Sequence, residues 1–206
     1  LGAALRRPEV LEAIEEALAT SKPAEVAFET IGVQPRFWRA FAKPLGVTLL
    51  VENIDPIAAA ISADFGNRSA HETRLLEIFT SVEEISHARK HLKKWMKPQR
   101  RGVSLWFQPG SARIVPQPLG VVGIIVAWNY PVYLAISPLV SALAAGNRVM
   151  VKMSEYAPKT GELFAKLIAK HFTEDEVCVV LGDPAVGEAF SSLPFDHLLF
   201  TGSTSI

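Results

Sequence analysis

The second half of this sequence alternates between short apolar runs and segments of helical pattern, and this alternation constrains the fold more than any other feature. VVGIIV, RVMVK, VCVV and HLLF are typical of buried strands, and the segments SPLVSALAAGN, APKTGELFAKLIAKHF and PAVGEAFSSL between them are typical of helices, the first with Ser137 as its cap. Such repetition predicts a parallel sheet with right-handed crossovers. Ligands of such sheets bind beyond the carboxyl ends of the strands, so the loops to inspect are AWNYP, KMSEYAP, GDPAVG and TGSTS.

The sequence before this alternation has mostly helical patterns. Residues 8–19 carry apolar side chains at helical spacing, and residues 55–67 run from the pair Asp55-Pro56 to a Gly-Asn stop. A long helix over about 69–96 is expected to begin with a capping box, Ser69 to Glu72. Its expected buried stripe consists of Leu75, Phe79, Val82, Ile85, Leu92 and Trp95.

Between the two halves lies a segment of different character, VSLWFQPGSARIVPQPLG. Its short β-prone runs flank the turn pair Pro109-Gly110, and its prolines keep it out of the middle of a sheet. We expect an extended hairpin arm whose apolar residues Leu105, Trp106 and Phe107 are exposed and mediate oligomer contacts. The expected fold class is α/β: N-terminal helices, the arm, and then a Rossmann-like parallel sheet that is incomplete in this sequence.

The charge balance and the single cysteine bear on which partners and which cellular location the sequence predicts. The 21 basic and 21 acidic residues balance, which gives no argument for nucleic acid or membrane. The uncharged stretch 114–147 is broken by prolines and glycines, so it is not a membrane helix. Residues 87–101 are strongly basic, which favours a solvated helix end over a polyanion contact. The single cysteine, Cys178, excludes an internal disulfide and predicts a reducing, cytoplasmic location.

Several familiar sites are missing from the sequence. No G-x-G-x-x-G follows the first strand, and Gly182 and Gly187 have P-loop spacing but lack the Lys-Ser/Thr that should follow. Neither H-E-x-x-H nor C-x-x-C is present. His87 and His91 lie four residues apart and could share a ligand, but a solvated basic face is the favoured interpretation. We therefore expect no metal site.

Taken together, four stretches resemble the N-terminal half of an aldehyde dehydrogenase: PLGVVGIIVAWNYP, RVMVKMSEYAP, LGDPAVG and PFDHLLFTGSTS. The likeness is greatest to the coniferyl aldehyde dehydrogenase branch, which AISADFGNRS supports, and it covers about residues 50–206. It implies NAD(P)-dependent oxidation of a small, possibly aromatic aldehyde to the acid, and a homodimer or homotetramer. It divides the chain into a helical part of the cofactor domain (1–101), an oligomerisation arm (102–120) and a Rossmann-like part (121–206).

The resemblance assigns a catalytic role to Asn129, whose side-chain amide would donate to an oxyanion. The alternative is an asparagine that bonds to the backbone of its own loop. Tyr130 and Tyr133 would border the aldehyde tunnel. The family usually has proline before Trp-Asn, whereas this sequence has Ala127, which loosens the backbone but removes no donor.

The resemblance also implies a cofactor site. Lys152 and Glu155 would hold the adenosine ribose, with NAD favoured and NADP possible because Lys152 could accommodate a 2′-phosphate. The alternative for both is a solvated surface charge. Trp128 would lie beside the cofactor, unless it packs in the core. The complete expected set is Trp128, Lys152, Ser154, Glu155, Gly182 (near the adenine), Thr201, and Gly202 with Ser203 (at the pyrophosphate).

The family's nucleophilic cysteine and general-base glutamate lie beyond the Phe-Thr-Gly-Ser motif, outside these 206 residues. Cys178 lies in an apolar strand without a base and is not expected to replace the nucleophile. We therefore expect the N-terminal portion of a longer enzyme, inactive on its own. The alternative is a non-catalytic nucleotide-binding or interaction module, and the downstream reading frame would distinguish the two.

Overall fold

The computed structural model describes residues 45–203, so the helix expected over 8–19 lies outside the described residues. The described chain begins with the helices α3 (Leu45–Val51) and α4 (Ile54–Phe65). α4 ends at Gly66, whose φ of 82° is the left-handed conformation expected of a glycine stop. A long helical rod follows, made of α5 (Ala70–Thr73), the π-helical turn η3 (Arg74–Phe79) and α6 (Thr80–Trp95).

The expected capping box and buried stripe of this rod are only partly correct. Ser69 precedes the first helical residue, but its side chain makes no capping hydrogen bond, and Glu72 pairs with Arg68 at 3.1 Å instead. Ile85 and Leu92 are buried as expected, whereas Leu75, Phe79 and Trp95 are 60%, 55% and 45% exposed. A π turn takes up an extra residue, which rotates the buried face. The inward side chains of the first turns are Thr73, Glu77, Ile78 and Ser81.

The sheet has the predicted parallel arrangement. Its strands are β3 (Val121–Ile125), β4 (Arg148–Lys152), β5 (Val177–Val180) and β6 (His197–Phe200), in the spatial order β5-β4-β3-β6. Val122 pairs with Val149 on one side and with His197 on the other. The chain first adds strands on one side of β3 and then returns to its other side, so the strand order reverses between β3 and β6. This reversal is the topological switch point at which open α/β sheets bind ligands.

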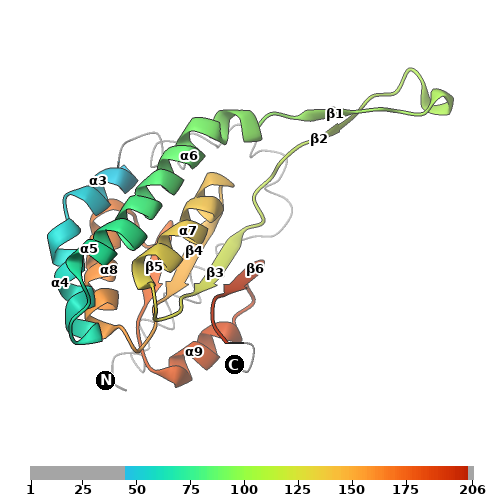
Figure 1. Cartoon of the computed structure of the whole chain (residues 1–206). Helices are drawn as coiled ribbons and strands as arrows, with labels where there is room; N and C mark the ends of the chain where they lie inside the picture. The colour runs from blue at the N-terminus through green and yellow to red at the C-terminus, as the bar shows by residue number, and fades with distance from the viewer. Residues whose placement is uncertain (1–44, 204–206) are drawn as a thin grey trace.

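Helices cover both faces of the sheet. α7 (Pro131–Ala144) and α8 (Pro158–His171) pack on one face, and α3, α4 and α6 join the same core, which contains Ile124 and Val151. α9 (Pro184–Ser191) covers the other face through Phe190, which clusters with Met150 and Val180. Figure 1 shows α6 beside α7 and α4 near α8, with α9 apart from these helices, below the strands.

The start of α7 corrects one expectation. Ser137 does not cap this helix, which begins six residues earlier at Pro131 and contains Pro138 in its interior. Proline suits the first helical position because its φ is already helical and it has no N–H to leave unpaired. The hydroxyl of Ser137 donates instead to Glu84 Oε1 at 2.9 Å, which ties α7 to α6.

The predicted hairpin arm extends away from this body (Figure 1). β1 (Gln99–Arg101) and β2 (Ala112–Ile114) pair antiparallel, and the short helix η4 (Leu105–Phe107) forms the tip. Leu105, Trp106 and Phe107 are 82%, 91% and 71% exposed. Within residues 45–203, no helix has the length and apolarity needed to cross a membrane.

Candidate active site at the carboxyl edge of the sheet

The loops that follow the four strands are held together by backbone hydrogen bonds that continue the sheet. Val126 N–H donates to Lys152 O at 3.0 Å, Met153 N–H to Val180 O at 3.1 Å, and Thr201 N–H to Ile125 O at 3.0 Å. Each bond joins the end of one strand to the start of a neighbouring loop. The residues predicted on separate loops therefore share one edge of the sheet.

Lys152, Ser154, Glu155 and Gly182 come together at this edge. The ammonium of Lys152, only 2% exposed, donates to Met153 O at 2.8 Å and to Gly182 O at 3.1 Å. Its Nζ lies 3.7 Å from Glu155 Oε2, and the Oγ of Ser154, in the same loop, accepts from Tyr156 N–H. Burial lowers the pKa of Lys152, and the negative charge of Glu155 opposes this shift. The alternative of a solvated surface lysine is therefore wrong.

Trp128 and Asn129 lie exposed on the loop after β3. Trp128 is 53% exposed, so it is not a core residue, and its ring centroid is 6.0 Å from that of Phe65. The backbone carbonyl of Asn129 accepts a hydrogen bond, but its side-chain amide bonds to no other described residue. The alternative in which this amide bonds to its own loop is thus not seen. The amide remains available to a ligand.

Two residues that the sequence did not reveal support this loop. Arg68 donates through Nη1 to Asn129 O at 2.6 Å, and its guanidinium lies 4.3 Å from the centroid of the Tyr130 ring. Glu77, fully buried, accepts from Val132 N–H at 2.7 Å through Oε2. Burial raises the pKa of Glu77, against lowering by its backbone hydrogen bonds and by Arg68. The signal that could have revealed Glu77 was a carboxylate on the buried face of the helix. The sequence pattern placed that face on Leu75 and Phe79 instead, and these two residues are exposed.

Carboxylates occupy the N-termini of the three helices that follow β3, β4 and β5. Glu77 accepts from the first turn of α7, and Asp64 accepts from Thr160 N–H of α8 at 2.8 Å. Asp183 caps α9 by accepting from Val186 N–H at 3.2 Å. Helix N-termini are the usual anion sites, but a carboxylate already present there repels a diphosphate. Of the strand ends that the structure describes, the turn after β6 is then the best placed for a diphosphate.

This turn consists of Thr201, Gly202 and Ser203. A Cβ at Gly202 would meet the far edge of the Phe200 ring, so a larger residue in this turn would require that half-exposed ring to move. Figure 1 places the turn beside the end of β3, at the switch point.

Cys178 lies away from this edge. It is within β5, where it pairs with Met150, and burial raises the pKa of its thiol to about 11, with a smaller contribution from Glu174. The thiol is therefore protonated near neutral pH and lacks the thiolate form that acts as a nucleophile.

The rings of His87 and His91 stack with centroids 4.1 Å apart. Across residues 45–203, no group of three or more His, Cys, Asp or Glu is arranged to hold a metal ion.

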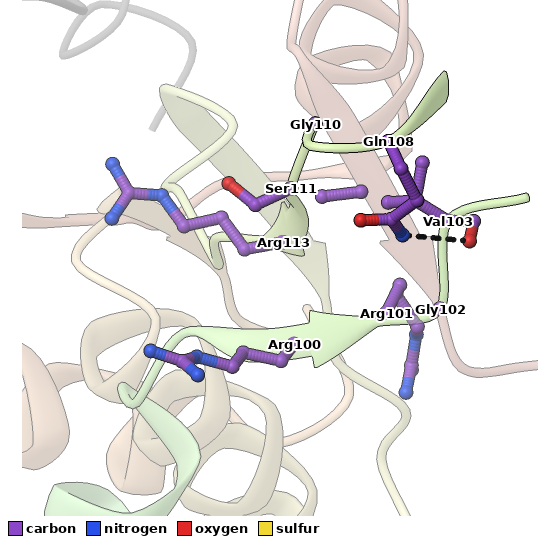
Figure 2. A pocket seen from close by; sticks show the side chains of 9 residues that line it. Arg100, Arg101, Gly102, Val103, Gln108, Gly110, Ser111 and Arg113 are labelled. Carbon is purple, nitrogen blue, oxygen red and sulfur yellow. Dashed lines mark hydrogen bonds between the residues drawn. The ribbon is translucent and has the colours of Figure 1, made fainter. Parts of the chain in front are cut away.

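A separate hollow of about 890 Å³ lies between the strands of the arm. Figure 2 shows Arg100 and Arg113 extending to the same side of the arm, and these two residues are directly opposite in the β1–β2 pairing. Gln108 donates to Val103 O at 3.4 Å and closes the other end of the hollow.

A doubly covered parallel sheet, with a buried lysine, a carboxylate and an exposed amide along its carboxyl edge, is the arrangement of a Rossmann-like nucleotide-binding fold. The chain belongs to the aldehyde dehydrogenase family, whose sequence model matches residues 6–206.

Among curated relatives, the chain is 60% identical over 158 residues to a probable coniferyl aldehyde dehydrogenase of Pseudomonas aeruginosa, a match that covers 77% of this chain and 33% of the relative. It is 49% identical over 160 residues to the coniferyl aldehyde dehydrogenase of Pseudomonas sp. strain HR199, covering 78% and 33%. The chain thus spans about a third of the length of the curated relatives that it matches.

Solved structures agree with the fold. Staphylococcus aureus AldH in a substrate-bound state matches with a TM-score of 0.82 and 30% identity, covering 92% of this chain and 41% of that one. A Mycobacterium tuberculosis aldehyde dehydrogenase complexed with NAD⁺ matches with a TM-score of 0.72 and 28% identity, covering 84% and 35%.

Proposed function

We propose that this chain forms the cofactor-binding, N-terminal part of an NAD⁺-dependent dehydrogenase that oxidises an aromatic, coniferyl-type aldehyde to the carboxylic acid. The observation that carries the proposal is the cluster of Lys152, Glu155 and Gly182 next to the exposed Trp128-Asn129 loop. The similarity to two coniferyl aldehyde dehydrogenases supports the aromatic substrate. The boundaries at residues 101 and 120 and a cytoplasmic location are parts of the same proposal.

The donor set suits the adenosine half of a nicotinamide dinucleotide. The Lys152 ammonium and the Glu155 carboxylate are 3.7 Å apart, close enough to donate to and accept from neighbouring ribose hydroxyls. Gly182 would lie near the adenine, and Ser154 belongs to the same loop as Lys152. Trp128 would lie beside the cofactor, and Thr201, Gly202 and Ser203 would contact the pyrophosphate. When bound, the dinucleotide supplies the hydride acceptor.

Asn129 would act on the substrate. Its amide is exposed at the edge of the sheet and is not used by its own loop. An uncharged amide donates without titrating, which suits a group that must stabilise an oxyanion over a range of pH. Tyr130 and Tyr133, at the start of α7, would border the path of the aldehyde.

The proposal is tested with the whole protein, numbered as here, and coniferaldehyde, while NADH formation is followed by its absorbance. We expect aldehyde-dependent NADH formation, with a higher kcat/KM for coniferaldehyde than for acetaldehyde. Formation of NADH with acetaldehyde but not with coniferaldehyde would contradict the aromatic substrate. No NADH with any aldehyde, in a protein that binds NAD⁺, would contradict the dehydrogenase itself.

We further propose that the arm mediates contacts between copies of the chain. Its tip exposes Leu105, Trp106 and Phe107 together, and an apolar patch of this kind marks an interface. Replacing Trp106 and Phe107 by Ser in the whole protein should lower the mass found by light scattering at micromolar concentration. Replacing exposed Leu75 and Phe79 by Ser is the control for general loss of apolar surface. An unchanged mass in the arm variant would contradict the assignment.

A further inference from the structure

The loop of Asn129 is held by side chains that come from a different part of the chain. Arg68 follows α4 and Glu77 lies in η3, whereas the loop follows β3, so the contacts join residues 55 to 61 positions apart. The Arg68 side chain is 6% exposed and that of Glu77 is fully buried. The cost of removing two charged groups from water can exceed what their pairing returns, so stability alone does not account for burying this pair.

The contacts cover the loop almost residue by residue. Trp128 packs near Phe65, and the guanidinium of Arg68 lies 5.0 Å from the centroid of the Phe65 ring and 4.3 Å from that of the Tyr130 ring. Arg68 binds the carbonyl of Asn129, which fixes the plane of the peptide bond that follows this residue. Glu77 binds the N–H groups of Val132 and Tyr133, which fixes where α7 begins. The side chain of Asn129 is the part of this residue that remains without such a contact.

Arg68 and Glu77 also contact each other, with Arg68 Nη1 at 3.4 Å from Glu77 Oε1. A second carboxylate, Glu72, lies 3.1 Å from Arg68 Nη2. The guanidinium therefore contacts two carboxylates, two aromatic rings and one carbonyl, and its one hydrogen bond goes from Nη1 to Asn129 O, while Nε and Nη2 make none to the described residues. A rigid planar cation of this kind holds a backbone group more precisely than a lysine can.

We propose that Arg68 and Glu77 are positioning residues that hold the amide of Asn129 in the orientation that the reaction requires. This inference rests on the proposed function, because it assigns Asn129 the role of oxyanion donor. The pair binds the backbone of Asn129, Val132 and Tyr133, and it acts on the amide of Asn129 through that backbone. Preorganised donors stabilise a transition state only when they are fixed before the reaction, which is what these contacts supply.

A double-mutant cycle in the whole protein tests this role. Arg68→Met should lower kcat by roughly 10- to 100-fold, the loss expected from a small misplacement of a reacting group, and leave the Kd for NAD⁺ within about twofold. In an Asn129→Ala background, the same substitution should lower kcat less than about threefold, because the group that Arg68 positions is gone. Arg68→Lys keeps the positive charge but not the planar guanidinium, so its kcat should lie between those of the wild type and Arg68→Met.

Arg74→Met is the matched control, since Arg74 forms an exposed ion pair with Asp55, and its kcat should not change. If Arg68→Met does not fold, Glu77→Gln serves in the same cycle because its side chain can still accept from Val132 N–H. Equal losses of kcat with and without Asn129 would overturn the inference and leave the proposed function intact. A normal kcat in Asn129→Ala would instead contradict the oxyanion role itself.

Discussion

The loops after β3 and β4 lie side by side at the same edge of the sheet, but the protein holds them in opposite ways. The β4 loop is held by its own residues and by the next loop along, through Lys152, Met153 O and Gly182 O. The β3 loop is held from outside the sheet, by Arg68 in the turn after α4 and by Glu77 of η3.

The difference matches what each loop would do. The β4 loop would bind a cofactor that has many contacts, and its lysine and carboxylate need only lie near each other. The β3 loop would present one amide to a reacting atom, and misplacing such a group by about 1 Å can cost 10²-fold in rate. We infer that the N-terminal helices serve the reaction as well as the fold, because they fix the loop on which the chemistry depends.

Of the substitutions considered, Asn129→Ala should distinguish the roles of the β3 and β4 loops most clearly. In the whole protein we expect kcat to fall by about 10²–10³, the usual loss for one oxyanion donor, with little change in the Kd for NAD⁺. Stopped-flow kinetics and fluorescence titration measure the two quantities. Asn67→Ala, on the exposed turn after α4, is the control. Parallel losses of kcat and NAD⁺ affinity would mean that the two loops do not have separate roles.

The opposite pattern is expected for Lys152→Met. Loss of a hydrogen bond from a charged donor costs about 1.5–3 kcal/mol, and we expect this to appear in the Kd for NAD⁺. When the Lys152→Met variant is saturated with NAD⁺, it should keep most of the kcat of the wild type. Calorimetric titration compares this variant with Lys166→Met, which alters an exposed lysine of α8. If NAD⁺ affinity is unchanged while the melting temperature drops, Lys152 is only a structural link between the β4 and β5 loops.

Glu155→Gln sharpens the cofactor side of the comparison. A carboxylate near the ribose 2′-hydroxyl repels a 2′-phosphate, by on the order of 1–3 kcal/mol. The wild-type protein should therefore prefer NAD⁺ to NADP⁺, and the variant should narrow the gap between the two Kd values. Glu162→Gln, exposed on α8, should leave the ratio unchanged. Equal or higher affinity of the wild type for NADP⁺ would show that Glu155 does not face the 2′ position.

The smallest expected effect is the contribution of Glu77 to the pH dependence of the protein's stability. Burial raises its folded-state pKa above the ordinary 4.5, so the unfolded chain releases this proton first as the pH rises. The stabilising contribution is therefore complete below pH 4.5 and is lost as the pH passes through the raised pKa. The melting temperature of wild type relative to Glu77→Gln should fall across this window. A rise would mean that pairing with Arg68 outweighs burial of the charge.

The sequence predicted the β4 loop better than the β3 loop for a physical reason. Lys152 and Glu155 lie three residues apart beside a strand, and Gly182 lies on the next strand's loop, so local pattern and sheet topology bring them together. Arg68 and Glu77 act over 55 to 61 residues, and no spacing rule connects them to the loop. The π turn also moved Glu77 onto the buried face, against a regular helical period.

The same reasoning explains the error at α7. Ser137 and Pro138 form a plausible local helix start, which is why the sequence predicted the helix there, but the helix begins at Pro131. The true start depends on a carboxylate from η3 that binds Val132 N–H. Tertiary contacts therefore set this boundary, while the strands and the two later helices follow from their own apolar patterns.

The most direct test of the two-loop account is a crystal structure of the whole protein with NAD⁺ bound. We predict hydrogen bonds from the ribose hydroxyls of the adenosine to Lys152 Nζ and the Glu155 carboxylate. We also predict that the nicotinamide lies beside the Trp128-Asn129 loop, with the Arg68 contact to Asn129 O unchanged from 2.6 Å. An adenosine that touches neither Lys152 nor Glu155, or a β3 loop that has left Arg68, would contradict the account.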